Sequence, residues 1–500
     1  MKKLKKAVTS RAVITALELL IQLVIIFIMI LRFSNYLSYY LIVSYALAII
    51  LSVRVINKRT NSGYKIGWLL LFLILPIFGA FLYMTVNGEV SKGSVQRKLN
   101  KIFDSSKIMF ENGNAAEIND DYARVQSEYI RRYNASIPVK NTHSKYFSSG
   151  EKFFESIIED LKLARHHIYL EYFILKSGYM WNEIKRILIE KARCGVDVRI
   201  IVDDFGSIDG INKRERKCLL AEGIKIKFFN PFVPVISGLL NNRDHRKICV
   251  IDTEIAYCGG VNIGDEYINL YERFGYFKDS GIAMYGEAAY NFEVFFVSLW
   301  EYVSKEKTEI IKPKYKETEK GVFHPYADSP IDDEYVSKNV YMNLINRAER
   351  YVYISTPYFV VDDEMLTAIT NAAKSGIDIR IVVPHIPDKI LVNQVTKSFY
   401  ERLISAGVKV YEYKKGFNHS KLAVADDRVA TVGSVNFDYR SFYLSFECGV
   451  WMYKTDSVPC VKKDLLSMME ESIEITKGMA KANVFVRFFR AILAAFSPML

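Results

Sequence analysis

One arrangement of strand-like and helix-like segments occurs twice in this chain, and this duplication limits the folds that are open to it. Each copy reads as strand, helix, strand, helix and strand, and a short polar stretch with a histidine follows. The first copy contains Ile168–Ile174, a helix over Trp181–Ala192, Gly195–Asp204, a helix ending in LLAEG, and Ile224–Phe229. The second contains Tyr351–Val361, a helix over Met365–Ala373, Gly376–Pro384, a helix ending in LISAG, and Val408–Tyr413.

The alternation of strands and helices predicts an α/β fold in which each copy forms a largely parallel sheet. Mainly apolar runs such as Val198–Val202 suit strands that are covered on both faces. We expect a first lobe at residues 141–310 and a second lobe at residues 311–500, with the charged segment Ser304–Lys320 at the seam. Residues 91–140 read as a linker and lead-in, and the duplication predicts that the two lobes face each other.

Each copy ends in a stretch that fits one template, H-x-K-x4-D-x6-G-[GS]-x-N. The first stretch lies within residues 240–267 and the second within residues 414–441. The template positions are occupied by His245, Lys247, Asp252, Gly259, Gly260 and Asn262, and again by His419, Lys421, Asp426, Gly433, Ser434 and Asn436. The chain has only seven histidines, and packing alone does not need a repeated His-x-Lys, so the pattern indicates a functional site.

The residue types of the template suit the transfer of a phosphodiester. Residues two apart on a strand share a face, so each histidine projects together with its lysine. Lys247, Lys421, Asn262, Asn436 and Ser434 offer donors to phosphate oxygens and to the charge of a five-coordinate transition state. One neutral imidazole can attack phosphorus, while the other, protonated, gives a proton to the departing alcohol and later takes one from the incoming alcohol. This two-step reaction needs no metal, and the cysteines and histidines show no metal-site spacing, so no metal or other cofactor is expected.

Two further carboxylates align when the copies are superposed. KDSGIAM (Lys278–Met284) corresponds to FECGVWM (Phe446–Met452), which sets Asp279 opposite Glu447. We expect each of these acids to orient an imidazole through its far nitrogen; the alternative is a carboxylate at a strand edge. Asp252 and Asp426 are grouped with the catalytic motif, but a regular strand would turn them to its other face, where they would support the fold and the charge balance.

The first ninety residues carry three apolar runs, Ala12–Leu31, Tyr36–Val53 and Ile66–Val86. Each run is close to the ~20 residues that a membrane-spanning helix needs, so residues 1–90 are predicted to be a membrane segment with two to three transmembrane helices. Pro76 lies inside the third run, which membrane helices tolerate. Basic clusters precede the first run, precede the third and follow the third, at residues 2–11, 54–65 and 92–101. Three full spans would put these clusters on different sides, although Lys and Arg prefer the cytoplasm. Either one run is interfacial or re-entrant, or the lobes face outward, so the side of the lobes stays open.

The net charge of +11 indicates an anionic partner, which can be nucleic acid, an anionic membrane or a phosphate substrate. Two segments outside the apolar runs could touch a membrane. One is the apolar loop Pro231–Leu240, and the other is the amphipathic C-terminal tail Val484–Phe496. For each, ordinary packing against the lobes is the alternative.

The duplicated template resembles that of the phospholipase D superfamily over residues 140–460. This resemblance implies a pseudo-twofold pair of α/β lobes with one active site at their junction. It also implies that the first-motif histidine, His245, is the nucleophile and that the second-motif histidine, His419, is the acid and base. The stretch YKIGWLLLFLILPIFGAFLYM, the motifs NRDHRKICVID and GFNHSK, and the ending SPML are similar to those of bacterial cardiolipin synthases.

The resemblance implies a multi-pass protein of a bacterial cell membrane. The implied reaction joins two phosphatidylglycerols into cardiolipin, releases glycerol and passes through a phosphohistidine, with phospholipid and membrane as partners and no nucleic acid. Three alternatives stay open. A membrane-bound hydrolase or another phosphatidyltransferase would use the same residues, a nuclease would not need the membrane segment, and a non-enzymatic scaffold would not need the histidines.

Overall fold

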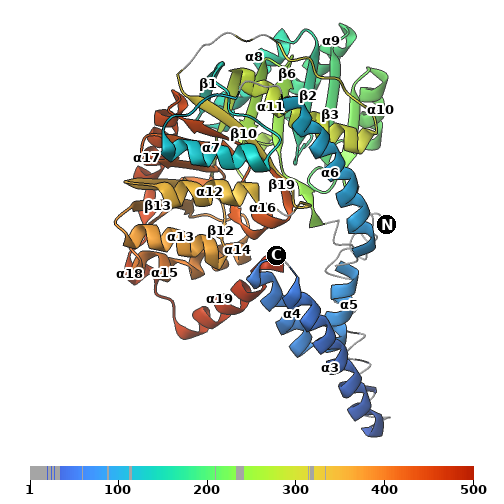
Figure 1. Ribbon diagram of the computed structural model, residues 1–500, viewed down its shortest axis with the longest axis vertical. Coiled ribbons are helices and arrows are strands. Elements are labelled where there is room, and N and C mark those ends of the chain that lie inside the picture. Colours follow the sequence, from blue (N-terminus) through green and yellow to red (C-terminus); the bar gives the residue numbers. More distant parts are fainter. Residues whose placement is uncertain are drawn as a thin grey trace. The chain divides into compact units, whose positions relative to one another are not determined.

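The computed structural model describes residues 34–58, 60–86, 89–111, 115–208, 210–231, 241–313, 315, 320–332 and 334–499, together with residues 20, 24, 27 and 28. Two compact units are present. The larger comprises Gln96–Pro231 and Asn242–Arg490, and the smaller comprises Met1–Val95, Phe232–Asn241 and Ala491–Leu500. The larger unit therefore contains the two predicted lobes except for residues 232–241 and 491–500; their helices and strands are drawn in Figure 1.

The two lobes each contain a mixed sheet with the same strand order. The first sheet runs β1 (Thr142–Phe147), β9 (Gly281–Gly286), β7 (Ile255–Gly259), β6 (Lys247–Ile251), β2 (His167–Tyr172), β3 (Asp197–Asp203), β4 (Lys225–Phe229). The second runs β10 (Val322–Asp328), β19 (Ser445–Tyr453), β17 (Val429–Gly433), β16 (Leu422–Ala425), β11 (Tyr351–Ser355), β13 (Asp378–Pro384), β14 (Lys409–Tyr413), β20 (Ser472–Glu474). The predicted α/β fold and its duplication are confirmed, and β20 is an addition to the second sheet.

The prediction of largely parallel sheets is wrong for half of each sheet. Within the repeated strand order, only the neighbours β2–β3 and β3–β4, and their counterparts β11–β13 and β13–β14, are parallel. The strand of each motif returns along its neighbour through a tight turn, which makes β6, β7 and β9 antiparallel, as are β16, β17 and β19. The predicted strand Tyr351–Val361 is also interrupted, because Pro357 has no N–H to give to a ladder, and the chain resumes pairing as β12 (Phe359–Val360).

Helices cover the sheets through apolar faces at helical spacing. In the first lobe these are α8 (Gly150–Leu163), α9 (Tyr179–Arg193), α10 (Lys213–Ala221) and α11 (Glu287–Ser304). In the second lobe they are α12 (Val336–Arg347), α13 (Asp363–Lys374), α14 (Ile390–Ser398), α15 (Tyr400–Ser405), α16 (Tyr439–Tyr443), α17 (Ser457–Glu470) and α18 (Lys477–Ala480). In α9, for example, Ile184, Ile187 and Leu188 share one face and are buried, and α9 packs on β3.

The two long helices that end each repeat also join the lobes. Helix α11 packs on strands of the first sheet and on β10 of the second, and α17 packs on strands of the second sheet and on β1 of the first. Most of α11 is buried, from Glu287 to Trp300, as expected for a helix enclosed on several sides. The lobes are thus held together by reciprocal helix packing as well as by the strands of the site.

The segment treated as a lead-in from the sequence contains α6 (Glu89–Glu111) and α7 (Asp121–Tyr133). Helix α7 contributes Tyr122, Ala123 and Ile130 to the core of the second lobe. Its polar side chains are used as well, since Oγ of Ser127 lies 2.8 Å from Nδ1 of the buried His324. The hydrophobic core of the second lobe therefore extends to residues before the first lobe.

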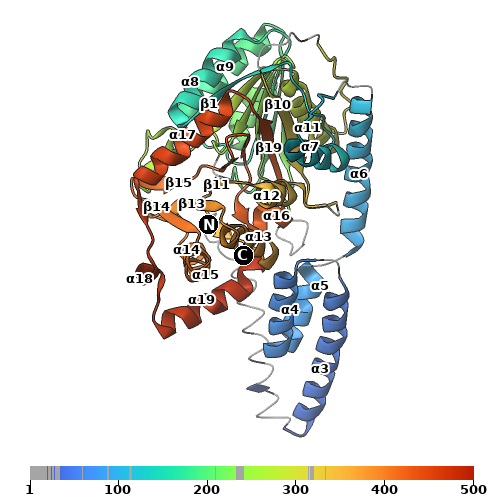
Figure 2. The same ribbon diagram turned by 60° about the vertical axis from the view of Figure 1, so that its left-hand side comes forward.

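The smaller unit contains α3 (Ser34–Asn57), α4 (Ser62–Ile74) and α5 (Pro76–Val86), which pack on one another (Figure 2). Among the described residues, one helical stretch, Ser38–Asn57, is long and apolar enough to cross a membrane, by length and composition alone. The first predicted run, Ala12–Leu31, and the loop Pro231–Leu240 lie mostly outside the described residues. The tail is helix α19 (Val484–Phe496), none of whose residues is buried.

The third predicted span, Ile66–Val86, is not a single helix. Helix α4 ends at Leu75, whose φ of −135° leaves the helical region, and Pro76 starts α5. In one continuous helix, positions 68 and 83 would lie about 22 Å apart at 1.5 Å per residue. The ring centroids of Trp68 and Tyr83 are only 5.1 Å apart, and a Cβ on Gly79 would come within 2.9 Å of the Phe72 ring. Helices α4 and α5 therefore fold back as a hairpin of 13 and 11 residues.

This hairpin predicts that both of its ends lie on one side of the membrane. Cysteines replacing Ser62 and Val86, in a chain whose exposed Cys194, Cys218 and Cys460 are changed to serine, should react equally with a membrane-impermeant maleimide in intact cells. A cysteine at Tyr36, before the long apolar stretch of α3, should report the opposite side. Labelling of positions 62 and 86 from opposite sides would show that α4 and α5 open into one span.

Candidate active site

Reciprocal strand pairs bring the two motifs together. Just before His245, β5 (Arg243–Asp244) pairs in parallel with β19 of the second lobe. Just before His419, β15 (Gly416–Asn418) pairs in parallel with β8 (Tyr276–Lys278) of the first lobe. The N–H of His245 donates to the Phe446 carbonyl at 2.9 Å, and the N–H of His419 donates to the Lys278 carbonyl at 2.7 Å. The backbone of each histidine is therefore fixed by the opposite lobe.

Each imidazole also contacts a carboxylate of the opposite lobe. Nδ1 of His245 lies 2.9 Å from Oε1 and 3.1 Å from Oε2 of Glu447. Nδ1 of His419 lies 2.6 Å from Oδ2 of Asp279. These acids are the two that repeat alignment singles out, and each one follows the carbonyl that accepts from the histidine N–H. Because Nδ1 is occupied in both rings, Nε2 is the nitrogen that remains for chemistry.

The two motif lysines are buried beside the histidines. Lys247 and Lys421 are each 1% exposed, and the Nζ of each donates to the backbone carbonyl of the histidine two residues earlier. Burial lowers the pKa of Lys247 to about 8 and that of Lys421 to about 7. A buried ammonium with a lowered pKa gains stability from any anion that binds next to it.

The predicted phosphate-binding residues differ in their surroundings. Asn262 accepts the N–H of Ile174 at 3.0 Å and donates to the Tyr267 hydroxyl at 2.8 Å. Asn436 is buried, and its Oδ1 has no hydrogen-bond partner among the described residues. The hydroxyl of Ser434 donates to the Glu447 carboxylate, so the geometry groups Ser434 with the acid beside His245 and not with a phosphate site.

Asp252 and Asp426 bind backbone amides far from the imidazoles. Asp252 accepts the N–H groups of Arg165, His166 and His167 at 2.7–2.8 Å. Asp426 accepts those of Glu349, Arg350 and Tyr351 at 2.7–3.0 Å. Both aspartates have a positive φ, 56° and 57°, in the turn that returns the motif strand, a conformation that Asp tolerates better than most residues. We therefore assign both carboxylates to holding this turn against the start of β2 or β11.

The charges around the two imidazoles are not equivalent. Burial lowers the pKa of His245 well below its usual value, and the cations Lys247, Lys421, Lys389 and Arg440 lower it further. Burial and Lys421 also lower the pKa of His419, to about 4, but Asp279 opposes this and favours the protonated ring. Burial raises the pKa of Glu447 to about 8, so this carboxyl group is largely protonated at neutral pH and supplies little negative charge to His245.

Several residues of the site were missed from the sequence. The hydroxyl of Ser441 donates to Oε1 of Glu447 at 2.7 Å, and the buried Asp203 accepts the N–H of Asp244, next to His245, at 3.1 Å. Burial raises the pKa of Asp203 to about 7. An acid at the end of a buried strand, as in RIIVDD, is the one sequence signal that could have identified Asp203; Ser441 carries none.

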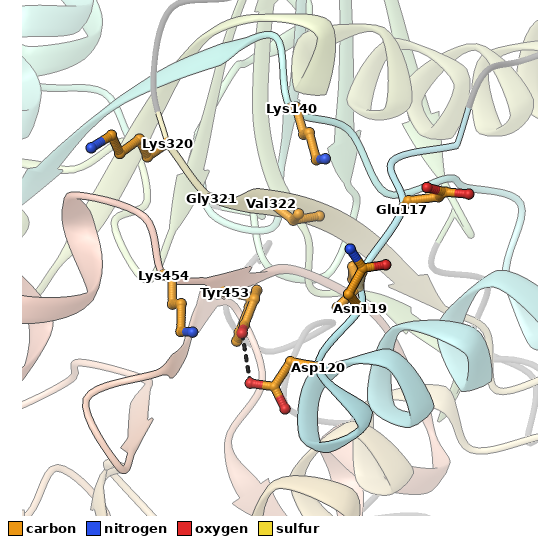
Figure 3. Close-up of a pocket in the computed structure, with 10 residues that line it drawn as sticks. Glu117, Asn119, Asp120, Lys140, Lys320, Gly321, Val322, Tyr453 and Lys454 are labelled. Atoms are coloured by element: carbon orange, nitrogen blue, oxygen red, sulfur yellow. Dashed lines mark hydrogen bonds between the residues drawn. The ribbon is translucent and has the colours of Figure 1, made fainter.

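Neither a group of metal-ligating side chains nor a surface hollow described by the structure marks the motifs. In the described part of the chain, no three or more His, Cys, Asp and Glu side chains gather as they would around a metal ion. A surface hollow of about 930 Å³ is lined by Glu117, Ile118, Asn119, Asp120, Lys140, Lys320, Gly321, Val322, Tyr453 and Lys454 (Figure 3). Its best-placed carboxylate, Asp120, already accepts the Tyr453 hydroxyl at 2.6 Å and caps α7, so this hollow is separate from the histidine site.

The turn contacts predict a stability effect. Asp426→Ala leaves three N–H groups without their acceptor and should lower the free energy of unfolding by about 2–4 kcal/mol, seen as a lower thermal midpoint of the full chain in detergent. Asp426→Asn keeps one acceptor oxygen and tolerates the positive φ, so its loss should be smaller. An alanine variant as stable as the parent would contradict the assigned role.

Relatives of known family share both the lobes and the N-terminal part. The family described as "Cardiolipin synthase, PLD-like domain" matches residues 157–300 and 341–469, one segment in each lobe. The family described as "Phospholipase_D-nuclease N-terminal" matches residues 46–86. An uncharacterized protein of Streptococcus mutans is 36% identical over 453 residues, which cover 89% of this chain and 98% of that protein.

Two of the similar proteins are cardiolipin synthases. That of Geobacillus sp. (strain WCH70) is 32% identical over 455 residues, which cover 89% of this chain and 90% of that protein. That of Geobacillus kaustophilus is 37% identical over 361 residues, or 71% of each chain. The crystal structure of phosphatidylserine synthase from Haemophilus influenzae superposes with a TM-score of 0.57 at 15% identity, over 76% of this chain and 100% of that one, and so shares the fold. The matches span both lobes and most of the chain, and the chain belongs to the phospholipase D-like cardiolipin synthase family.

Proposed function

We propose that this chain is a cardiolipin synthase that transfers a phosphatidyl group from one phosphatidylglycerol to another. The observation that carries the proposal is the pair of imidazole–carboxylate contacts, His245–Glu447 and His419–Asp279, formed between lobes beside two buried lysines. Two imidazoles with a free Nε2 match the two tasks of phosphodiester exchange, nucleophilic attack and proton transfer. The cardiolipin synthases among its relatives support the choice of lipid.

In the first step, Nε2 of His245 attacks the phosphorus of the donor lipid. A nucleophilic imidazole must be neutral. The charged neighbours that act most on His245 are all cations and lower its pKa, whereas those of His419 include the anion Asp279. The P–N bond forms, the P–O bond to glycerol breaks, and protonated His419 gives its proton to the glycerol oxygen. Asp279 favours the protonated form of His419, and a bound phosphodiester anion adds to this effect.

In the second step, neutral His419 takes a proton from a hydroxyl of the acceptor phosphatidylglycerol. The acceptor oxygen attacks the phosphohistidine, the P–N bond breaks, and cardiolipin leaves with His245 restored. Lys247 and Lys421 stabilise the negative oxygens in both transition states, and Asn262 and Asn436 are proposed as further phosphate contacts. Ser434 and Ser441 hydrogen-bond to Glu447 and fix its position. Glu447 and Asp279 in turn fix the orientation of the two imidazole rings.

We further propose that the chain is a multi-pass protein of the bacterial cell membrane, anchored by the apolar runs that end with α3. An anchored active site meets lipid substrates at high local concentration, and a basic surface gains about 1 kcal/mol per Lys or Arg near anionic lipids. A hydrolase is the second candidate, because water in place of the acceptor hydroxyl would use the same residues.

Product analysis separates these two functions. Purified chain in mixed micelles with phosphatidylglycerol alone and with chelator should yield cardiolipin and free glycerol, detected by thin-layer chromatography and mass spectrometry. Phosphatidic acid without cardiolipin would instead identify a hydrolase.

Removal of either motif histidine should abolish turnover. His245→Ala and His419→Ala are each expected to lower the rate by about 10³-fold or more, because the nucleophile or the proton carrier is lost. His166→Ala, an exposed histidine outside the motifs, is the matched control and should keep full activity. Activity close to that of the parent chain in either motif variant would contradict the two-histidine mechanism.

The lysine pKa values predict the alkaline side of the pH profile. The ratio kcat/KM reports groups of the free enzyme, and a lysine is charged only below its pKa. The acid of the first step, His419, has a pKa of about 4 in the free chain, so kcat/KM already falls above pH 4. With pKa values of about 7 for Lys421 and about 8 for Lys247, this fall should become steeper as the pH rises from 7 to 9. Lys421→Arg keeps its charge and should move the steeper part to higher pH. A kcat/KM that falls no more steeply above pH 7 than below it would show that these charges are not needed.

A further inference from the structure

Exposed apolar side chains occur on three segments, distant in sequence, each of which adjoins residues that contact or act on one of the motif histidines. They are Phe205, Ile208, Leu270, Tyr271, Ile390 and Leu391, which are between 49% and 72% exposed. We call this set the apolar rim. Removing apolar surface from water is favourable by roughly 25 cal/mol per Å². Six large exposed apolar side chains near one site therefore form a candidate binding surface.

The first part of the rim is the loop after β3. The N–H groups of Phe205 and Gly206 both donate to Asp203 at 3.0 Å, and the other oxygen of Asp203 accepts the N–H of Asp244, which precedes His245. The Arg243 guanidinium also lies 5.1 Å from the Phe205 ring centroid. Phe205 and Ile208 are therefore held at the edge of the sheet from which His245 projects.

The second part follows η2 (Asp265–Ile268). The Tyr267 ring lies 5.6 Å from the His419 ring, and the N–H of Leu270 donates to the Asp265 carbonyl at 3.1 Å. Leu270 and Tyr271 thus continue directly from a segment that touches the second imidazole.

The third part is the start of α14. Lys389, the residue before α14, lies 4.8 Å from the Tyr358 ring centroid, and its charge lowers the pKa of His245. The Tyr358 ring lies 6.4 Å from the Phe417 ring, which in turn lies 5.8 Å from that of His419. Ile390 and Leu391 therefore stand next to a cation that acts on the active site.

The opposite edge of the sheets has a different surface. There the turn after β16 carries the ion pairs Arg350–Asp427 and Lys462–Asp427, at 3.0 and 2.5 Å.

On the side of the rim, helix α14 contacts the amphipathic tail, because Nε of Arg490 in α19 donates to Gln394 at 3.0 Å. Phe485 of that tail is 85% exposed. Apolar bulk next to cations, at the catalytic edge, is the composition of surfaces that enter the headgroup layer of an anionic membrane.

We propose that the apolar rim inserts into the surface of an anionic bilayer, so that a lipid phosphate reaches His245 while its acyl chains stay in the membrane. This inference rests on the proposed lipid substrate and adds how the site meets it. The exposed cation Lys389, next to Ile390 of the rim, matches the negative headgroups, and the rim side chains replace water around the site. A rim sealed in this way also favours a lipid hydroxyl over water as the acceptor.

The rim is tested with two substrates of the same headgroup. Full-length chain reconstituted in vesicles would be given long-chain phosphatidylglycerol in the bilayer, or short-chain phosphatidylglycerol dissolved as monomers. The double variant Ile390→Ser/Leu391→Ser should lower turnover of the bilayer lipid at least tenfold and change turnover of the monomer less than twofold. Leu163→Ser, at the C-terminal end of α8 and 66% exposed, is the matched control and should change neither. Equal losses on both substrates, or no loss on either, would overturn the proposal.

Insertion can be measured without turnover. A tryptophan replacing Leu391 should be quenched by brominated acyl chains in phosphatidylglycerol vesicles, after subtraction of the signal of the parent chain, whereas a tryptophan replacing Leu163 should not. Absence of quenching at position 391 would refute the proposed insertion of the apolar rim into the membrane. If the parent chain turned over neither lipid, the proposed function would fail, and the quenching result would still decide the membrane contact.

Discussion

The active site depends on an exchange between the lobes, in which each lobe supplies the histidine of one pair and the carboxylate of the other. The contacts His245–Glu447 and His419–Asp279 can form only when both lobes are in place. The same residues are tied by backbone bonds, since the N–H of each histidine donates to the carbonyl just before the opposite acid. Orientation of the imidazoles and association of the lobes are therefore one structural requirement, and the long helices α11 and α17 stabilise it by packing across both sheets.

The duplicated geometry is filled with different residues in the two halves. A Cβ on Gly260 would come within 2.1 Å of Asp279, so glycine leaves room for the carboxylate that faces His419. At the equivalent place, Ser434 donates to the longer Glu447. Behind His245, the buried Arg246 contacts Glu171 at 2.5 Å and Asp244 at 3.2 Å, where the second lobe has the neutral set Ser420, Ser355 and Asn418. The two half-sites thus differ in charge, which fits the division into nucleophile and proton carrier that we propose.

The sequence could predict what depends on local pattern and on repetition. The template and the alignment of the repeats identified both histidines, both lysines and the two acids that contact the rings, because these positions recur at fixed offsets. It could not predict which acid meets which histidine, because that pairing crosses the lobes and joins residues more than a hundred positions apart. Ser434 is a different case: its hydroxyl donates to Glu447 on the neighbouring strand of the same lobe, a contact that the template alone does not reveal. The break at Pro76 was misjudged because composition alone does not distinguish a kinked span from a hairpin, and only the contact of Trp68 with Tyr83 separates the two.

Charge balance ties the geometry of the site to its substrate. Lys247 and Lys421 are almost completely buried, and each donates to a neutral carbonyl; of the two neighbouring acids, Glu447 has its pKa raised by burial. Keeping two ammonium groups charged in such a place is unfavourable, which is why their pKa values fall to about 8 and 7. A bound phosphodiester would place a negative charge next to the two ammonium groups. The additional negative charge of the five-coordinate transition state would be stabilised more strongly still. The unfavourable burial of the two lysines in the free chain therefore favours binding of a phosphodiester anion beside them and, in the transfer reaction that we propose, stabilises the transition state.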